Sequence, residues 1–168
     1  MKGTHIVAKE KIEKTNAMRI LDRAKIAYIH RCWEDATAEH TGVELAAALQ
    51  QNPEQVFKTL VTAGKSGAYY VFMIPVAETL DLKKAAAAVH EKALTMLKAK
   101  DLLPLTGYVH GGCSPVGMKK LFVTTIHQSA ENFETILFSA GKIGHQLEVS
   151  LADLRKVIPY AFADVVVV

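Results

Sequence analysis

The spacing of hydrophobic and polar positions predicts both helices and strands along this chain. Apolar positions three and four residues apart favour helices, and Thr15 and Asp81 each stand where a helix N-cap is expected. Asn52-Pro53-Glu54 indicates a further helix entry, with Pro53 in the first turn. Pro104 marks the end of another helix. The helices predicted with clear bounds cover 15–25, 42–50, 82–90, 95–102 and 151–157.

Alternating and uniformly β-prone runs predict the strands. They cover 25–33, 57–62, 68–75, 121–126, 135–138, 145–149 and 160–168. Gly64-Lys65-Ser66-Gly67 joins two of them, which predicts a hairpin. Strands and helices alternate irregularly. We therefore expect a single α/β domain with a mixed sheet, which can close into a barrel.

Composition sets the class of the protein. The chain has 168 residues, of which 50% are hydrophobic and 22% charged, as is usual for one globular domain. Two distant cysteines, Cys32 and Cys113, offer neither a disulfide framework nor a zinc pair. No apolar run approaches the roughly 20 residues of a membrane helix, and no secretory segment opens the chain. We expect a cytoplasmic protein that binds no membrane.

Charge is concentrated at the N-terminus. Residues 1–31 carry eight Lys and Arg against three acids, a net +5, whereas the remainder carries a net −2. A basic segment on a near-neutral body can contact a polyanion, or it can be a solvated helix face. We divide the chain into a basic extension over 1–14 and a domain over 15–168. The total of +3 is modest for a DNA-binding protein, and we expect no DNA partner.

Common catalytic motifs are missing. Gly64-Lys65-Ser66 lies between two strands and lacks the first glycine of a phosphate loop, so we interpret it as a hairpin turn. The seven histidines show no metal-ligand spacing, and we expect neither a metal nor a cofactor. His110 lies three residues before Cys113. Such a pair can form a thiol nucleophile with its base, but proximity in sequence is weak evidence and the sequence favours a structural cysteine.

Two glycine-containing loops are the best candidates for chemistry. In Gly111-Gly112-Cys113-Ser114-Pro115 the glycines allow unusual backbone angles, while Pro115 restricts its neighbour. Such a loop can present backbone N–H groups to a carbonyl oxygen or an anion. Ser139-Ala140-Gly141-Lys142 offers a similar surface after a strand, and both loops can equally be tight connections. Lys58 lies in an apolar strand, where it either faces water or binds a ligand in a cleft.

Several segments together resemble one known family. They are Val56-Phe57-Lys58-Thr59-Leu60, the run from Leu80 to Ala86, the run from Thr106 to Lys120 that contains the GGxSPxGxKK pattern, and Ser139-Ala140-Gly141-Lys142. In this order they are typical of the YbaK/EbsC family of free-standing aminoacyl-tRNA deacylases. That family is similar to the editing insertion domain of bacterial prolyl-tRNA synthetase. The resemblance runs from about Thr15 to the C-terminus.

The resemblance implies a fold, a reaction and partners. The fold would be one α/β domain with a twisted, barrel-like mixed sheet and helices outside. The reaction would be trans-editing, the clearance of mischarged Cys-tRNA(Pro), in which the cysteinyl thiol attacks its own carbonyl and no protein nucleophile or cofactor is used. The partners would be the acceptor end of the mischarged tRNA and prolyl-tRNA synthetase, with no membrane involved.

The resemblance also assigns residues. Lys58, Gly111 and Gly112 would be catalytic, with Lys58 on the terminal nucleotide and the two glycines on the carbonyl oxygen. The substrate-binding residues would be Thr59, Trp33, Cys113, Ser114, Pro115, Ser139, Gly141 and Lys142. Trp33 stands where better-known members carry tyrosine, Ala140 replaces a glycine, and Ile143 stands where arginine is common. These departures leave open a deacylase for another small amino acid, such as Ala-tRNA(Pro), and a non-catalytic module that binds tRNA or a synthetase.

Overall fold

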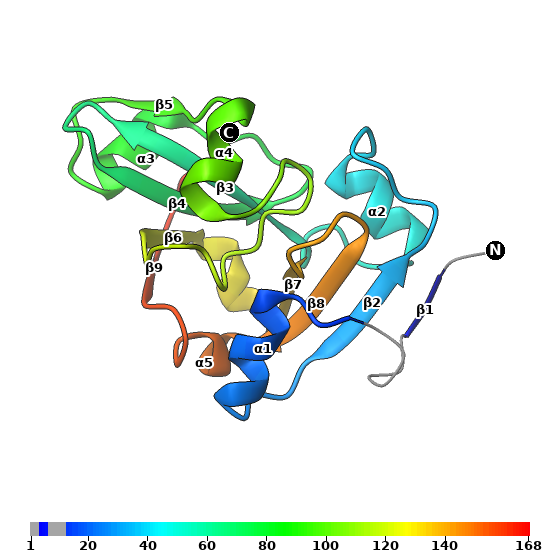
Figure 1. The fold of residues 1–168 in the computed structure, drawn as a ribbon. Helices are drawn as coiled ribbons and strands as arrows, with labels where there is room; N and C mark the ends of the chain where they lie inside the picture. The colour runs from blue at the N-terminus through cyan, green and yellow to red at the C-terminus, as the bar shows by residue number, and fades with distance from the viewer. Residues whose placement is uncertain (1–3, 7–12) are drawn as a thin grey trace.

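Two β-sheets form the framework of the protein in a computed structural model that describes residues 4–6 and 13–168 (Figure 1). The first sheet is antiparallel, with the order β1-β2-β8-β7. The second is mixed, with the order β5-β3-β4-β6-β9, in which β6 runs parallel to both of its neighbours. The strands are β1 (Thr4–Ile6), β2 (Ile29–Trp33), β3 (Phe57–Gly64), β4 (Tyr69–Pro75), β5 (Leu94–Met96), β6 (Val123–His127), β7 (Thr135–Ser139), β8 (His145–Ser150) and β9 (Tyr160–Ala163).

Within residues 4–6 and 13–168, one β-bridge joins the two sheets, and they do not close into a barrel. Val56, just before β3, forms a parallel bridge with Leu137 in β7. The Leu137 N–H donates to the Gln55 carbonyl at 3.1 Å. The prediction of a mixed α/β domain is confirmed, but the barrel-like sheet is wrong, because this one bridge replaces the continuous pairing that a closed barrel needs.

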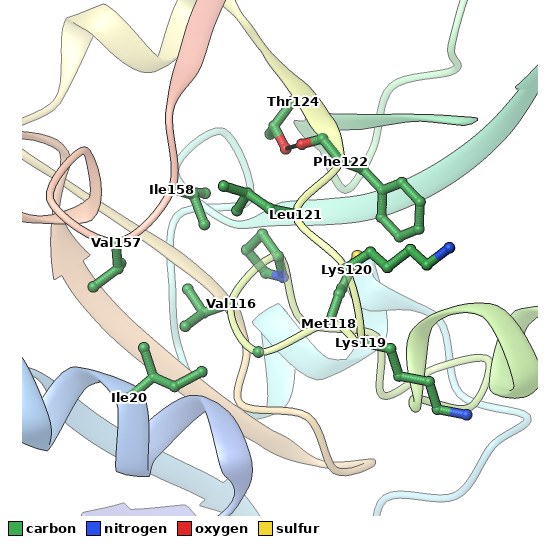
Figure 2. Close-up of a pocket in the computed structure, with 12 residues that line it drawn as sticks. Ile20, Val116, Met118, Lys119, Lys120, Leu121, Phe122, Thr124, Val157 and Ile158 are labelled. Carbon is green, nitrogen blue, oxygen red and sulfur yellow. Dashed lines mark hydrogen bonds between the residues drawn. The ribbon is translucent and has the colours of Figure 1, made fainter. Parts of the chain in front are cut away.

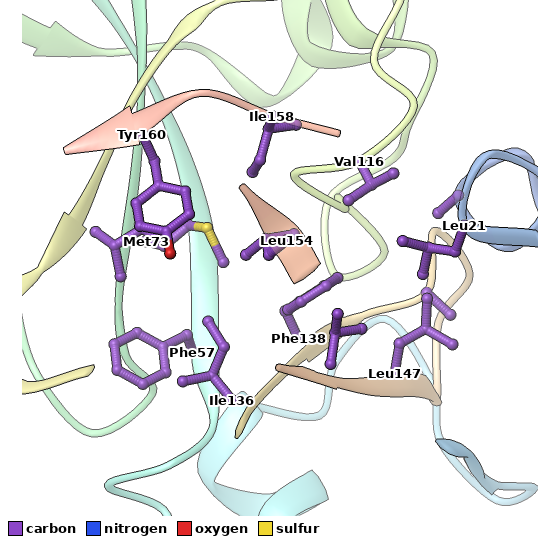
Figure 3. Packing of buried hydrophobic residues seen from close by; sticks show 14 of the residues in the cluster. Leu21, Phe57, Met73, Val116, Ile136, Phe138, Leu147, Leu154, Ile158 and Tyr160 are labelled. Atoms are coloured by element: carbon purple, nitrogen blue, oxygen red, sulfur yellow. The ribbon is translucent and has the colours of Figure 1, made fainter. Parts of the chain in front are cut away.

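The main core fills the space between the sheets (Figure 3). Phe57 and Met73 reach it from the mixed sheet, while Phe138 and Leu147 reach it from the antiparallel sheet. Leu21 adds the apolar face of α1 (Asn16–Arg23). A second cluster lies between the mixed sheet and α3 (Leu82–Ala88), so the mixed sheet is covered on both faces.

Helix starts follow the predicted caps. Thr15 accepts from the Met18 N–H at the start of α1, and Asp81 accepts from two N–H groups at the start of α3. Thr41 forms a full capping box with Glu44 at α2 (Gly42–Ala48). Ser150 accepts from the Asp153 N–H and opens α5 (Leu151–Leu154), which is shorter than predicted. These local side-chain contacts satisfy N–H groups that a helix leaves unpaired.

Two predicted helices are wrong, because tertiary pairing overrides the local pattern. Asn52-Pro53-Glu54 forms a turn that leads directly into β3. Residues 94–96 form β5, because Thr62 in β3 pairs with Met96. The helix that follows, α4 (Ala99–Thr106), begins later and contains Pro104, and it ends at Gly107 with φ +88°.

The chain ends differ from their prediction in extent. The last strand, β9, stops at Ala163, although Val166 bridges Leu80 further on.

A short 3₁₀ helix, η2 (Gln128–Asn132), links β6 to β7 and was not predicted. Much of the basic extension over 1–14 lies outside the described residues and stays a prediction; its last member, Lys14, forms an ion pair with Asp22. No helix among the described residues is long and apolar enough to cross a membrane.

The core arrangement predicts a contrast between two leucines. Leu147 is fully buried between the sheets, whereas Leu103 on α4 is 51% exposed. We expect Leu147→Ala to lower the free energy of unfolding by about 2–5 kcal/mol, since the cavity left behind cannot collapse fully. Leu103→Ala should change it by less than about 1 kcal/mol. Urea denaturation of both variants checks this, and equal losses would contradict the packing described here.

Candidate functional site

A cavity of about 580 Å³ opens where four segments of the chain meet. These segments are residues 36–43 before and within α2, the first half of β3, the loop that follows α4, and the connection between β7 and β8. A volume of this size is in the range of small-molecule sites. It is larger than a second hollow of about 150 Å³ beside α1, and we take it as the candidate site.

The loop after α4 is held by its own polar side chains. The Thr106 hydroxyl donates to the Leu102 carbonyl at 2.8 Å and accepts from the Tyr108 N–H at 3.1 Å. The Tyr108 hydroxyl donates to the Val116 carbonyl at 2.6 Å across the loop. Burial raises the pKa of Tyr108 to about 12, so this hydroxyl stays protonated. The Asn16 amide donates to the Gly117 carbonyl at 2.9 Å, which ties the loop to α1.

The β7–β8 connection is a closed turn. The Ala140 N–H donates to the His145 carbonyl at 2.9 Å, and the His145 N–H donates to the Lys142 carbonyl at 3.0 Å. The Ser139 hydroxyl accepts from the Gly141 N–H at 3.1 Å. Gly141 has φ +98°, a left-handed conformation that favours glycine. The hydroxyl of Ser139 therefore shapes the turn beside the cavity.

Glycines let the two loops touch. A Cβ atom on Gly112 would lie 3.1 Å from the Ile143 nitrogen, and one on Gly141 would lie 2.6 Å from Cε1 of Tyr108. A Cβ on Gly117 would lie 2.6 Å from the Tyr108 hydroxyl. The Tyr108 ring is thus packed between glycines of both loops. Any side chain at these positions would push the loops apart.

Lys58 supplies the positive charge of the cavity. It lies in β3 opposite Ile74, and its side chain is partly buried. Burial lowers the pKa of its amine, and the Glu78 carboxylate partly opposes this effect. Lys58 is the only lysine or arginine among the described residues that line the cavity. One anionic group of a ligand can therefore be paired at this wall.

Two buried polar atoms on the cavity walls lack partners among the described residues. They are the Thr59 hydroxyl and the Oε1 atom of Gln146. A buried polar group without a hydrogen bond is costly. Both atoms expose less than 1 Å², so a polar ligand in the cavity could bond to them only after a shift of the wall.

Cys113 borders the cavity as a neutral thiol. It is buried with Val61 and Leu102, and burial raises the pKa of the thiol to about 12. His110 also borders the cavity, but no hydrogen bond joins the two side chains in the described structure. A thiol with such a pKa is a poor nucleophile at neutral pH, so the structure supports the structural interpretation of Cys113. No group of three or more His, Cys, Asp or Glu within residues 13–168 is placed to hold a metal ion.

The structure places some of the predicted site residues on the cavity wall and others outside it. Lys58, Thr59, Gly111, Cys113 and Ser139 all line the cavity. Six other predicted residues do not line it: Trp33, Gly112, Ser114, Pro115, Gly141 and Lys142.

Several of those six have other contacts. The Gly112 N–H donates to the Val109 carbonyl at 3.0 Å, so it is already used. The N–H of Gly111 has no acceptor among the described residues. The buried Ser114 hydroxyl accepts from the Val116 N–H at 3.3 Å. Of the two glycines, Gly111 is therefore the one that both lines the cavity and has an N–H without an acceptor among the described residues.

Sequence reasoning missed one whole wall. Residues 36–43, with His40 among them, border the cavity, as do Ile143 and Gln146. Residues 36–43 carry no catalytic motif, and their place follows from the packing of Ala46 in α2 against Val56, Val76 and Leu137. Tyr108 lies within the glycine-rich run, and the only available signal was an aromatic residue among small ones.

A second hollow of about 150 Å³ lies beside α1 (Figure 2). Its walls are mostly apolar, with Ile20, Val116 and Val157 facing one another (Figure 2). Lys119 and Lys120 also border it, but their side chains extend away from its centre (Figure 2). It lacks the converging polar groups of the larger cavity, so the chemistry belongs to the larger one.

Comparisons with known proteins relate the sequence of this chain to one family. Residues 37–157 match the family model of the aminoacyl-tRNA editing domain. A curated relative from Enterococcus faecalis (strain ATCC 700802 / V583), named "Putative Cys-tRNA(Pro)/Cys-tRNA(Cys) deacylase EbsC", is 41% identical over 162 residues, which cover 95% of this chain and 98% of the relative.

Solved structures share the fold. The crystal structure of the hypothetical protein APE2540 has a TM-score of 0.82 at 21% identity and covers 91% of this chain and 100% of its own. A protein described as a "putative trans-editing enzyme for prolyl tRNA synthetase" has a TM-score of 0.76 at 21% identity, over 94% of this chain and 100% of its own. At this level of identity the likeness establishes the fold.

The contact between Gly141 and Tyr108 gives a matched test. Gly141 and Gly67 both have left-handed φ values, +98° and +94°, but a Cβ on Gly67 would meet nothing within 4 Å. We expect Gly67→Ala to cost about 1–2 kcal/mol of unfolding free energy from backbone strain alone. Gly141→Ala should cost about 1–3 kcal/mol more, from overpacking against Tyr108. Thermal and urea unfolding measure both, and equal costs would show that Tyr108 does not hold the turn.

Proposed function

The chain belongs to the aminoacyl-tRNA editing domain family, and on that premise we propose that it is a trans-editing deacylase that removes cysteine from mischarged proline tRNA. The cavity beside Lys58 carries this proposal, because it joins one cation, one available backbone N–H and apolar walls in a single space. The substrate is taken from the name of the relative that is 41% identical. The proposal places the protein in the cytoplasm, where aminoacyl-tRNA is used.

Proline tRNA needs such an enzyme for an energetic reason. A synthetase pocket shaped for proline cannot strongly reject a smaller amino acid, since one methylene is worth only about 1–3 kcal/mol. A second site must then remove the error. The solved structure described as a trans-editing enzyme for prolyl-tRNA synthetase supports the same partner here. We therefore include the tRNA acceptor end and prolyl-tRNA synthetase as partners in the proposal.

Lys58 and Gly111 receive distinct roles. The Lys58 ammonium pairs with the phosphate or sugar of the terminal nucleotide, and so places the ester in the cavity. The Gly111 N–H donates to the ester carbonyl oxygen as negative charge develops on it. A preset donor of this kind lowers the activation free energy by on the order of 3 kcal/mol. Gly112 acts through its close approach to Ile143, which holds the loop in place.

The substrate supplies the nucleophile. The protein's own candidates are not activated: the Cys113 thiol is neutral, the hydroxyls of Ser114 and Ser139 accept from backbone N–H groups, and the buried Thr59 hydroxyl has no hydrogen-bonded base among the described residues. The sulfur of the cysteinyl group attacks its own carbonyl carbon. A carbon–sulfur bond forms, the ester carbon–oxygen bond breaks, and the thiol proton ends on the ribose oxygen of the released tRNA. The first product is a cyclic thiolactone.

Loss of Lys58 is the first test of this site. We expect Lys58→Ala to lower single-turnover deacylation of Cys-tRNA(Pro) by about 100-fold or more, as for other preset charged donors. Its unfolding free energy should not fall, because burial lowers the pKa of this amine and folding therefore disfavours its charged form. Lys65→Ala, in the exposed turn of the same hairpin, is the control and should keep full activity. Joint loss of stability and activity in Lys58→Ala would make the residue structural.

A second test separates the two thiols. Cys113→Ala should keep deacylation of Cys-tRNA(Pro) within about threefold of the unmodified protein, since this residue only lines the wall. Ala-tRNA(Pro), which has no thiol, should be stable to the protein in the same single-turnover assay. Cleavage of the alanyl ester would move the nucleophile to water or ribose. Loss of cysteinyl cleavage in a folded Cys113→Ala would assign the nucleophile to the protein.

A further inference from the structure

Two aromatic rings stand together at the rim of the cavity. The indole of Trp33 and the imidazole of His40 have centroids 4.5 Å apart with an interplanar angle of 41°. His40 lines the cavity, and so do Ala36 and Gly144, which both lie against Trp33. Both rings are partly exposed. The pair is thus an accessible aromatic surface beside the proposed aminoacyl site.

Backbone contacts fix the main chain of Trp33 beside two residues that line the cavity, Ala36 and Gly144. Its N–H donates to the Gly144 carbonyl at 2.9 Å, and its carbonyl accepts from the Ala36 N–H at 3.1 Å. A Cβ on Gly144 would lie 2.8 Å from the Trp33 carbonyl oxygen, so glycine permits this approach. Trp33 is therefore attached to the same turn that closes the cavity.

A hydrogen bond also fixes the His40 ring. Its Nδ1 accepts from the Thr37 N–H at 2.9 Å. In the neutral ring the proton then lies on Nε2. The orientation of His40 is set before any ligand arrives, so little freedom would be lost when a ring stacks on the pair.

A nucleotide bound in the cavity needs a contact for its base in addition to Lys58. The cavity's volume of about 580 Å³ exceeds the size of a small aminoacyl group, so the cavity has room for the nucleoside to which that group is attached. Lys58 is the only lysine or arginine on its described walls and can pair with one anionic group. Proteins that bind single-stranded nucleic acid combine basic groups for the backbone with aromatic side chains on which bases stack.

We propose that Trp33 and His40 form a stacking surface for the unpaired terminal adenine of the tRNA acceptor end. This inference rests on the proposed function and adds the contact that positions the terminal nucleotide. Stacking fixes the base, Lys58 pairs with the phosphate or sugar, and the ester then reaches Gly111. Trp33 is a positioning residue in this arrangement, because it touches the base and not the reacting atoms.

Fluorescence tests the contact directly, because Trp33 is the single tryptophan of the chain. The intact protein is titrated with uncharged tRNA(Pro) that ends in CCA and with the same tRNA trimmed to CC. We expect the complete tRNA to quench Trp33 emission and the trimmed tRNA to leave it nearly unchanged. Equal quenching by both, or quenching by neither, would overturn the proposal. Deacylation is measured separately, so failure of the stacking contact and failure of the proposed function are distinguishable.

Two variants then separate positioning from structure. Trp33→Leu removes the ring, and we expect KM for Cys-tRNA(Pro) to rise about tenfold with kcat unchanged, in line with the loss of one stacked base. Trp33→Phe keeps a ring and should restore most of the affinity. On tRNA whose terminal residue is abasic, both variants should match the unmodified protein. A fall in kcat in both variants, or an undiminished defect on the abasic substrate, would assign Trp33 a structural role instead.

Discussion

The contact of Tyr108 with two glycine-containing loops is the constraint on which the site depends. The ring lies where side chains on Gly117 or Gly141 would have to be, and its hydroxyl donates to the Val116 carbonyl at 2.6 Å. One buried aromatic residue therefore sets the distance between the loop after α4 and the β7–β8 turn. Because Gly111 and Ser139 belong to these two loops, the same contact sets the width of the cavity where these two residues line it.

The open arrangement of the sheets explains where the cavity lies. Among the described residues, only the bridge between Val56 and Leu137 joins the two sheets, and β5 covers β3 only from Thr62 to Gly64. The first half of β3 is therefore free along one edge, and Lys58 and Thr59 reach the cavity from it. A closed barrel would pair this edge and remove the entrance. The fold thus combines a rigid core on one side of β3 with a ligand-accessible edge on the other.

Local chemistry predicted much of this fold, and long-range pairing decided the rest. Thr15, Asp81 and Ser150 cap the helices expected of them, and the hairpin turns at Gly64 to Gly67 as its residues indicate. The segment at 94–96 looked helical but pairs with β3, a contact that no local pattern contains. Whether the sheets close into a barrel likewise depends on which strand edges pair, and the hydrophobic periodicity of the sequence carries no information about that pairing.

The residues of the candidate site were likewise only partly predictable from the sequence. The family resemblance assigned Lys58, Gly111 and Ser139, whereas a lysine in a strand or a glycine-containing loop can by itself equally be structural. The resemblance did not identify His40 or Gln146, which reach the cavity only through packing. It also gave Gly112 the same role as Gly111, because hydrogen bonding within the loop cannot be seen in the sequence; the Gly112 N–H is in fact donated to Val109.

The most direct measurement is a crystal structure with adenosine that carries cysteine on its 3′ position through an amide, a linkage that the protein cannot cleave as it would the ester. The account predicts that the amide carbonyl oxygen accepts from the Gly111 N–H and that the Lys58 ammonium contacts the ribose, with the cysteinyl sulfur facing its own carbonyl carbon. A ligand bound instead in the hollow beside Ile20 and Val157, or one whose carbonyl lies against Cys113, would contradict it.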